Sequence, residues 1–413
     1  MKRFLACMLS LALIMAAVPG MAAEQVTLHL FHQKQEAQET FAKIIEEFTA
    51  QYPNIQVEQE IVTNEPAAVL KARIATDEIP DIFQAGLDTI DISKGGYMAD
   101  LTDQEFLQNI NEDAVGSSSF TDEEGRTWAM PIDGSCIGIL YNKDVFAQYG
   151  LSVPTTLAEF DSVVKTLRDN GVTPFALGFK DAWTIKITGV CAFSPAVYGR
   201  DLGWDALKNE GKATFAGTPE WTRSFELLRK IYESGDQQTA FDTDYNGACA
   251  MLANGEAAMM AQGLWAVEVV RSVNPDANIG MMAMPVSEDP GETKLHQFPD
   301  FGLSISSKSA HIPECELFLE FLTRKDIAEV WCNTAKLFSA VKGVSVDFDP
   351  VAADVNAYIA QGMVCPQADR GWPTAFHADF ESAISAYLLD KLTAQDAMKQ
   401  LDTAWDTAYA AAR

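Results

Sequence analysis

The sequence is short of positive charge. Its 413 residues include 30 Lys and Arg against 58 Asp and Glu, so the formal net charge is −28. Phosphate backbones and anionic lipid surfaces repel a protein this acidic, which makes nucleic-acid and membrane-surface binding poor interpretations. A strongly anionic ligand is disfavoured for the same reason. Hydrophobic residues make up 48% of the chain, enough for large cores, and the length predicts roughly two to three domains.

Motifs for catalysis and metal binding are also missing. There is no H-E-x-x-H, no P-loop and no G-x-G-x-x-G after a predicted strand, and the five His residues lack metal-ligand spacing. Residues 134–138 fit G-x-C-x-G, but a nucleophile elbow needs a helix after it, and here a strand follows. We therefore interpret Cys136 as a small buried residue. We predict no catalytic residue, cofactor or metal, although a two-carboxylate glycosidase site would go unnoticed in so acidic a chain.

Long apolar runs are absent except at the N-terminus. Residues 1–23 have the pattern of a secretory signal peptide, with two basic residues, an apolar stretch, and small residues for cleavage after Ala22 or Ala23. Cys7 lies in a stretch similar to a lipidation box, but it precedes the apolar run, so we assign it to the signal. We expect an exported protein, in the periplasm or at the extracellular face of the cytoplasmic membrane.

Six cysteines follow the signal, without a C-x-x-C pair or a Cys/His cluster at zinc spacing. An oxidising compartment would permit disulfides. A chain of this length does not need them to fold, so disulfides and buried free thiols both remain open.

Short apolar runs alternate with amphipathic segments, which is typical of α/β folds. Val26, Leu28 and Leu30 alternate as in a strand. Thr156 and Glu159 have capping-box spacing, which predicts the start of a helix. We find no internal repeat and no Pro/Ser-rich linker, so we expect domains joined by short crossings rather than by one flexible tether.

Motifs in a characteristic order span nearly the whole chain after the signal. They are PDIF at 80–83, MP at 130–131, ILYNKDVF at 139–146, GLSVPTT at 150–156 followed by EF at 159–160, GEAAMM at 255–260 with GLW at 263–265, and GLSIS at 302–306 with FLEFL at 318–322. This set resembles the extracellular solute-binding protein family 1, the substrate-capturing subunits of ABC importers, in the sugar-binding branch that includes maltose-binding protein. NGVTPFALG at 170–178 followed by Trp183 resembles, more weakly, the raffinose or α-galactoside subgroup.

The resemblance implies an α/β fold of the periplasmic-binding-protein type II class, with two lobes around a ligand cleft and three hinge crossings. The crossings are expected near 132–135, 298–302 and 338–342. The N-terminal lobe would comprise 24–132 and 303–338, and the C-terminal lobe 136–300 and 343–413. The implied function is capture of a neutral mono- or oligosaccharide by a monomer that closes around it and delivers it to the permease subunits of an ABC transporter.

Two other kinds of function remain open at this stage. One is a secreted carbohydrate-active hydrolase. The other is binding of a polyol, peptide or polyamine on the same fold. The aromatic residues expected around the cleft favour sugars, because sugars present flat C–H faces and a fringe of hydroxyls.

Stacking on a sugar face requires an exposed aromatic ring. Trp265 follows Gly263 in the family motif, Trp183 lies just past a predicted strand end, and Trp372 lies in an irregular stretch before the C-terminal helices. The other Trp residues are expected to be packing residues: Trp128, Trp204, Trp221, Trp331 and Trp405. Residues 84–88 lack the aromatic that maltose-binding protein carries there, so maltodextrin is not the expected ligand.

Hydroxyl groups require polar side chains. The loop after the first strand and the residue that follows the PDIF strand offer such groups, and two carboxylates lie at predicted crossings. The full set of predicted ligand-binding residues is His32, Gln33, Glu36, Asp88, Asp133, Trp183, Trp265, Asp300, Phe301, Arg370 and Trp372.

Overall fold

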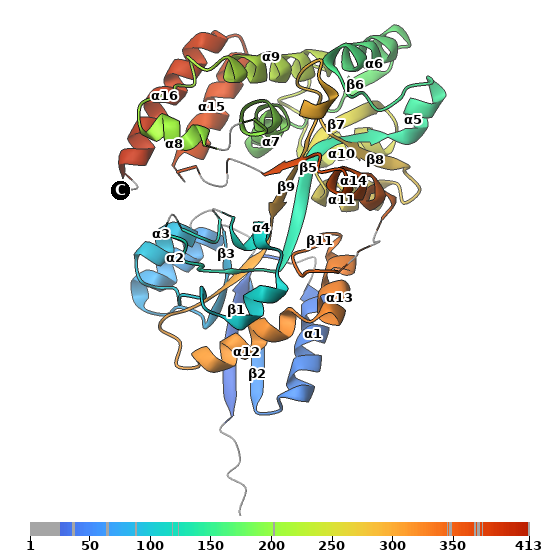
Figure 1. Ribbon diagram of the computed structural model, residues 1–413. Helices are drawn as coiled ribbons and strands as arrows, with labels where there is room; N and C mark the ends of the chain where they lie inside the picture. Colours follow the sequence, from blue (N-terminus) through green and yellow to red (C-terminus); the bar gives the residue numbers. More distant parts are fainter. Residues whose placement is uncertain are drawn as a thin grey trace, which may run out of the picture.

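The computed structural model describes residues 25–34, 38–62, 66–86, 89–117, 119–122, 124–200, 203–344, 346, 349–366, 369, 372–373 and 375–411. The predicted signal at 1–23 lies outside these residues. The chain forms two α/β bodies, and each contains its own sheet (Figure 1). The expected α/β class is therefore confirmed.

The first sheet has the strand order β2-β1-β3-β10-β4. Its strands are β1 (Val26–His32), β2 (Ile55–Ile61), β3 (Ile82–Ala85), β4 (Met130–Pro131) and β10 (Gly302–Ile305). Its helices are α1 (Gln38–Gln51), α2 (Pro66–Thr76), α3 (Thr89–Lys94), α4 (Glu112–Val115), α12 (Ile312–Leu322) and α13 (Lys325–Ala335), with a 3-10 turn at Glu105–Asn109. The strands β1, β2 and β3 are parallel, whereas β10 runs antiparallel to β3.

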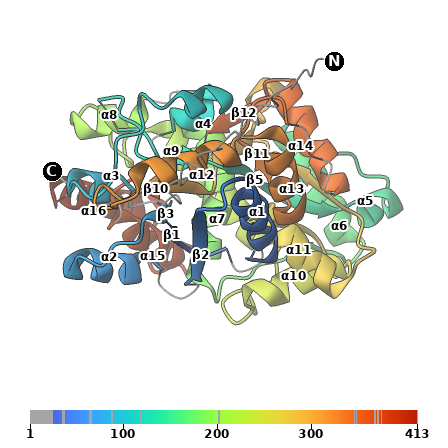
Figure 2. The ribbon, with the colours of Figure 1, turned by 90° about the horizontal axis from the view of Figure 1, so that it is seen from below.

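Alternation along β1 produces two cores. Leu28 and Leu30 pack with Phe41 and Phe48 of α1, whereas Phe31 packs with Leu70 of α2. Helices therefore cover both faces of this sheet, with α1 and α13 on one side of β1 and α2 and α3 on the other (Figure 2). The strand periodicity predicted from 26 to 30 is confirmed.

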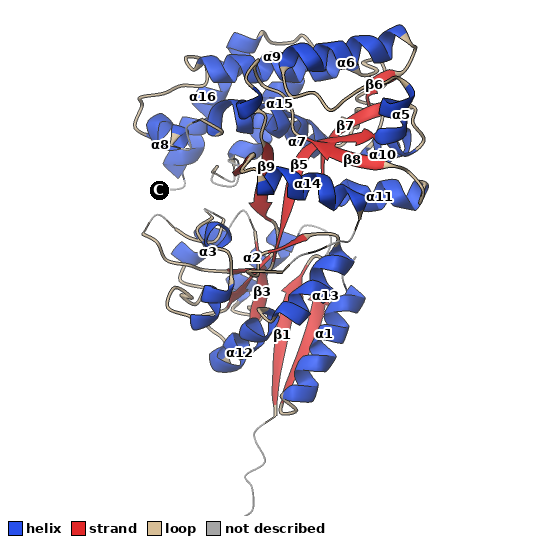
Figure 3. Cartoon of the chain, turned by 45° about the vertical axis from the view of Figure 1, so that its right-hand side comes forward, coloured by secondary structure: helices blue, strands red, loops and turns tan. Residues whose placement is uncertain are grey.

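The second sheet has the path β12-β9-β5-β7-β6, with β8 and β11 also paired to β5. Its strands are β5 (Asp133–Asn142), β6 (Thr173–Phe175), β7 (Ala257–Gly263), β8 (Ile279–Met282), β9 (Leu295–Pro299), β11 (Phe338–Ser339) and β12 (Val364–Pro366). Helices flank these strands, as the cartoon coloured by secondary structure shows (Figure 3). They are α5 (Lys143–Gln148), α6 (Leu157–Asp169), α7 (Ala182–Phe193) with a π turn at Ser194–Tyr198, α8 (Trp204–Asn209), α9 (Pro219–Ser234), α10 (Tyr245–Ala253), α11 (Trp265–Val273), α14 (Pro350–Ala360), α15 (Phe376–Leu388) and α16 (Ala394–Ala411), and a 3-10 turn lies at Pro290–Glu292.

The predicted cap of α6 is present in a shifted form. The Thr156 hydroxyl accepts a hydrogen bond from the Glu159 backbone N–H at 3.3 Å. The Glu159 carboxylate reaches the backbone N–H of Thr155, one residue earlier than in a regular capping box, at 2.7 Å. The backbone N–H and the hydroxyl of Thr155 both donate to the Glu159 carboxylate, and by stabilising its ionised form they hold the pKa of Glu159 below its usual value.

The cysteines and the tryptophans expected to pack inside the protein are buried. The six cysteines after the signal are free and buried, and Cys136 is fully buried within β5, as we interpreted it. The predicted packing residues are also buried: Trp128, Trp204, Trp221, Trp331 and Trp405. Within the described ranges, no helix has both the length and the apolar composition required to cross a bilayer.

Candidate ligand-binding site at two opposed sheet edges

The first sheet directs its carboxyl edge toward the second body. His32 ends β1 and Ala85 ends the neighbouring parallel strand β3. Gly302, the first residue of β10, pairs with Ala85, so Asp300 reaches the same edge. Open α/β sheets place their ligands outside the carboxyl ends of strands. We call Gln33, Lys34 and Asp300 the polar edge.

The second sheet directs its carboxyl edge toward the first body. β7 is antiparallel to β5 and ends with Gly263 opposite Ile137, close to the start of β5. β6 is parallel to β7 and therefore points the same way. The helices that follow or precede these strands bring Trp183, Tyr245 and Trp265 to this edge, since each lies in the first turn of its helix. We call these three residues the aromatic edge.

Short crossings connect the two sheets. The Ile132 backbone N–H donates to the Phe301 carbonyl at 2.8 Å, and the Asp300 N–H donates to the Asp133 carbonyl at 3.1 Å. A third segment joins them where the Ala340 N–H donates to the Ile132 carbonyl at 3.2 Å. In Figure 1, β5 and β9 pass between the two bodies at this place.

Trp183 is the most exposed of the eight Trp residues, with 38% of its surface accessible. Its ring centroid lies 5.0 Å from that of Tyr245, with a tilt of 56° between the planes. The Asp181 carboxylate accepts a hydrogen bond from the Tyr245 backbone N–H at 2.8 Å and so anchors this pair. We did not single out Tyr245 from the sequence. The sequence feature that could have indicated it is its position at the start of the helix that precedes β7. That position places Tyr245 at the carboxyl edge of β7.

Trp265 is half-buried and lies over the backbone of Gly263. A Cβ atom at Gly263 would come within 2.2 Å of the indole ring, so only glycine permits this placement. The ring also lies 6.4 Å from the Phe298 ring at an interplanar angle of 67°. The spacing of the G-x-W motif therefore has a steric cause, because Gly263 makes room for the indole at the sheet edge.

The polar edge contains an ion pair that the sequence did not predict. The Lys34 ammonium lies 2.7 Å from the Asp300 carboxylate, and the two side chains are only 13% and 21% exposed. The ammonium also lies 5.8 Å from the centre of the Phe301 ring. Partial desolvation strengthens such a pair relative to one at an open surface. Both groups offer hydrogen bonds to sugar hydroxyls, as donor and acceptor respectively.

A second cationic group lies one turn past Trp183 on α7. The Lys186 ammonium is 3.6 Å from the Asp369 carboxylate and 3.5 Å from Nδ1 of His377, and its side chain is 14% exposed. Burial raises the pKa of nearby Glu381, and Lys186 partly opposes this shift. Lys186 was also not predicted from the sequence, because its relevance depends on α15 packing against α7.

Two predicted residues of the first-strand loop have different environments. His32 is fully buried, its Nε2 lies 3.1 Å from the Gln59 side-chain oxygen, and its Nδ1 accepts from the Lys34 backbone N–H at 3.2 Å. The imidazole therefore lies inward against Phe41 in this arrangement, and its contact with a ligand remains a prediction. Gln33 is exposed and remains a predicted contact.

Three more predicted residues lie inside the protein. Trp372 is 3% exposed, stacks on Phe193 at 5.2 Å and donates from Nε1 to the Tyr198 hydroxyl at 3.1 Å. Phe301 and Asp133 are both fully buried. Trp372 packs into an aromatic core, and Asp133 and Phe301 face each other where the crossings meet. In this arrangement protein atoms cover all three side chains, and their predicted contact with a ligand remains untested.

The remaining predicted contacts divide in two groups. Trp183, Trp265 and Asp300 lie at the opposed edges and stay predictions. Glu36, Asp88 and Arg370 lie outside the described residues. Over the ranges that the structure covers, no group of three or more His, Cys, Asp or Glu side chains is arranged to hold a metal ion.

Two α/β bodies with opposed carboxyl edges and several short crossings define the two-lobed class of periplasmic-binding-protein-like folds. The chain belongs to the family described as bacterial extracellular solute-binding protein, whose profile matches residues 33–329. This is a family of binding proteins rather than enzymes.

The chain is similar to several proteins whose names state a sugar ligand. The multiple sugar-binding protein of Streptococcus mutans is 28% identical over 337 residues, covering 78% of this chain and 77% of that protein. The melibiose/raffinose/stachyose-binding protein MelE of Bacillus subtilis is 24% identical over 383 residues, covering 88% and 86%. Among solved structures, RafE in complex with raffinose superposes with a TM-score of 0.77 at 24% identity, covering 93% of this chain and all of that one.

Proposed function

We propose that this protein captures a neutral carbohydrate outside the cytoplasm and delivers it to the permease subunits of an ABC transporter. The aromatic edge carries this proposal. Exposed indole surface costs free energy in water unless a ligand covers it, and sugar C–H faces are suited to aromatic rings. The lysine and carboxylate of the polar edge supply groups for hydroxyls on the opposite side.

Closure of two lobes would bring the two edges together around the sugar. We infer an N-terminal lobe of 24–132 with 303–338 and a C-terminal lobe of 136–300 with 343–413, acting as a monomer. The memberships of β1 to β9 support these boundaries, whereas β11 at the third crossing pairs with β5 of the second sheet. A ligand shifts such an equilibrium only through contacts that exist in the closed arrangement, which is why contacts from both edges matter.

We further propose an oligosaccharide of the raffinose type as the ligand. The names of MelE and of the RafE complex support this choice, as does the resemblance of residues 170–178 and Trp183 to that subgroup. The acidic net charge of −28 is compatible with a neutral ligand, which is recognised by rings and hydrogen bonds rather than by charge.

The test is calorimetric titration of the exported form with raffinose, stachyose, melibiose and maltotriose, and with spermidine as a cationic non-sugar. We expect binding of at least one α-galactoside, a raised melting temperature and no change in the sugar. Chromatography of the incubated sugars checks the last point. Released monosaccharides would establish the hydrolase alternative, and binding of spermidine alone would overturn the carbohydrate assignment.

A further inference from the structure

The Asp133 side chain lies where the crossings meet. Its residue opens β5 of the second sheet, and in the β5–β11 ladder it pairs with Ser339. Its Oδ1 accepts a hydrogen bond from the Phe301 backbone N–H at 3.0 Å, immediately before β10 of the first sheet. A carboxylate on the crossing between β4 and β5 therefore binds the backbone of the crossing between β9 and β10.

The other carboxylate oxygen connects the crossings to a helix of the first body. Oδ2 accepts a hydrogen bond from Nε1 of Trp331 on α13 at 2.7 Å. The Trp331 indole stacks on Phe301 at 5.5 Å and packs edge-on against Phe41 of α1 at 4.8 Å. Rotation of the second body about the crossings would have to move Asp133 relative to this packed indole.

We propose that Asp133 is a positioning residue that fastens the crossings to α13 and sets the balance between open and closed arrangements of the two lobes. This rests on the lobe movement put forward under the proposed function. In this role the residue needs no contact with a ligand. It acts because a change in the angle between the lobes would bend or break its two hydrogen bonds.

The ionised and protonated forms of Asp133 would fasten the hinge differently. An ionised carboxylate accepts strong hydrogen bonds from both N–H groups. The acid form is a weaker acceptor, and its O–H group needs an acceptor of its own. Burial raises the pKa of Asp133 to about 7, opposed by Lys34 and reinforced by Asp300. Besides this pair, the neighbouring titratable groups are Cys332 on α13 and the His32 ring, which lies 6.3 Å from the Phe301 ring.

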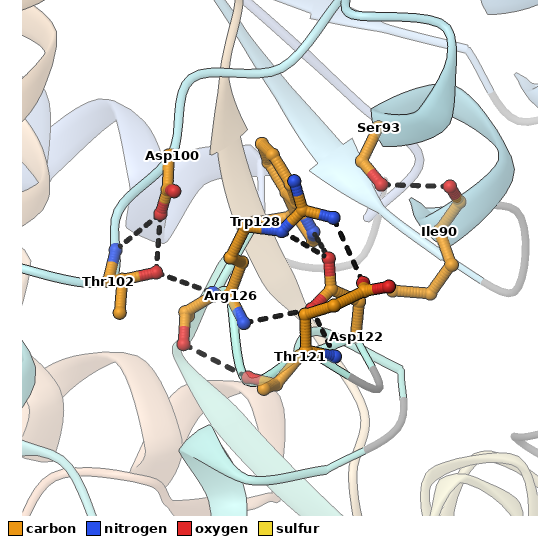
Figure 4. Close-up of polar contacts among 10 residues, drawn as sticks. Ile90, Ser93, Asp100, Thr102, Thr121, Asp122, Arg126 and Trp128 are labelled. Carbon is orange, nitrogen blue, oxygen red and sulfur yellow. Dashed lines mark hydrogen bonds and ion pairs between the residues drawn. The ribbon is translucent and has the colours of Figure 1, made fainter.

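The chain supplies a matched control outside the crossings. Asp122 is also almost buried, with 7% of its side chain exposed, and it accepts from Nε1 of Trp128 at 2.9 Å. It also pairs with Arg126, whose Nε lies 3.0 Å from the carboxylate (Figure 4). This Asp–Trp pair lies within the first body and contacts no crossing, so it should not influence the interlobe angle.

The experiment is small-angle X-ray scattering of the ligand-free protein at pH 6 and pH 8. Five proteins are compared: the wild type, Asp133→Asn, Trp331→Phe, Asp122→Asn and Trp128→Phe. We expect a larger radius of gyration for both hinge variants than for the wild type at pH 8, and no change for the two controls. The wild type should expand at pH 6, and Asp133→Asn should lose this pH step.

Circular dichroism and melting curves verify that each variant is folded. If Asp133→Asn does not fold, Trp331→Phe still tests the inference, because it keeps an aromatic ring at this position and removes the Nε1 donor, and Trp128→Phe controls for the smaller ring. Unchanged radii in the folded hinge variants would overturn the proposal. So would a pH step that persists in Asp133→Asn, because a group other than Asp133 would then cause it. Since no sugar is present, failure of raffinose binding would count only against the proposed ligand.

Discussion

The two opposed edges differ in chemistry although they occupy equivalent places in their sheets. The aromatic edge presents Trp183 and Trp265 with a tyrosine beside the former, whereas the polar edge presents a lysine–aspartate pair held at 2.7 Å. Rings gain free energy by covering apolar surface without a strict angular requirement, whereas charged groups gain only when hydroxyls arrive in defined directions. The comparison suggests that the aromatic edge supplies affinity and the polar edge supplies orientation.

The largest effect is expected at the aromatic edge. Trp265→Ala or Trp183→Ala should weaken raffinose binding by about 30-fold or more, corresponding to about 2 kcal/mol, as for central aromatic contacts in other interfaces. Titration calorimetry measures the loss. Trp128→Phe, a change at a buried ring within the first body, is the control and should bind as the wild type does. Equal affinity of the Trp265→Ala protein would remove Trp265 from the site.

A smaller effect is expected at the polar edge. Lys34→Met and Asp300→Asn should each weaken binding by about five- to tenfold, roughly 1 kcal/mol, because a typical hydrogen bond contributes about that net amount. A double-mutant cycle measures how much of the loss arises from their mutual ion pair. If these variants lose more affinity than the Trp variants, the assignment of affinity to the aromatic edge is wrong.

The steric relation between Gly263 and Trp265 provides a sharper test of the aromatic edge. Gly263→Ala should displace the indole and reduce raffinose affinity several-fold, because the new Cβ would overlap the ring. In a Trp265→Ala background the same change should have little further effect. Tryptophan fluorescence and calorimetry measure both. Full additivity of the two substitutions would show that Gly263 acts through something other than the indole.

The smallest effects concern pH, and the two Asp–Trp pairs should respond with opposite signs. Burial tends to raise the pKa of Asp122, but bonds from Arg126 and Trp128 outweigh it and lower the pKa. Its contribution to stability is therefore present above the unfolded value of 3.8 and is lost as the pH falls through the lower folded value. Asp133 has a raised pKa, so its contribution is present below 3.8 and is lost as the pH rises through about 7.

Melting temperatures between pH 3 and pH 8 test these signs. Asp122→Asn should be less stable than the wild type at pH 7, and the difference should shrink toward pH 3. The stability of Asp133→Asn relative to the wild type should improve as the pH rises from 5 to 8, because the wild type must then bury a charge. A parallel pH dependence of both variants would contradict the different roles assigned to the two carboxylates.

Much of the fold was predictable because it depends on local patterns. Alternation in β1 and the cap at Thr156 require only neighbouring residues, and both are present. The site was less predictable. Trp183 and Trp265 lie in the first turns of their helices at the aromatic edge, whereas Trp372 is buried against Phe193 of α7, a contact that its neighbouring residues do not encode.

The sequence by itself determined the α/β class, the strongly acidic net charge and, through ordered motifs, the family to which the chain belongs. These properties follow from composition and from short-range periodicity. Only the tertiary structure decided that Asp133 and Phe301 lie inside the crossings and that Lys34 faces Asp300, 266 residues away. The physical reason is that exposure and electrostatic pairing depend on long-range packing. Such packing brings together residues whose proximity no local sequence pattern predicts.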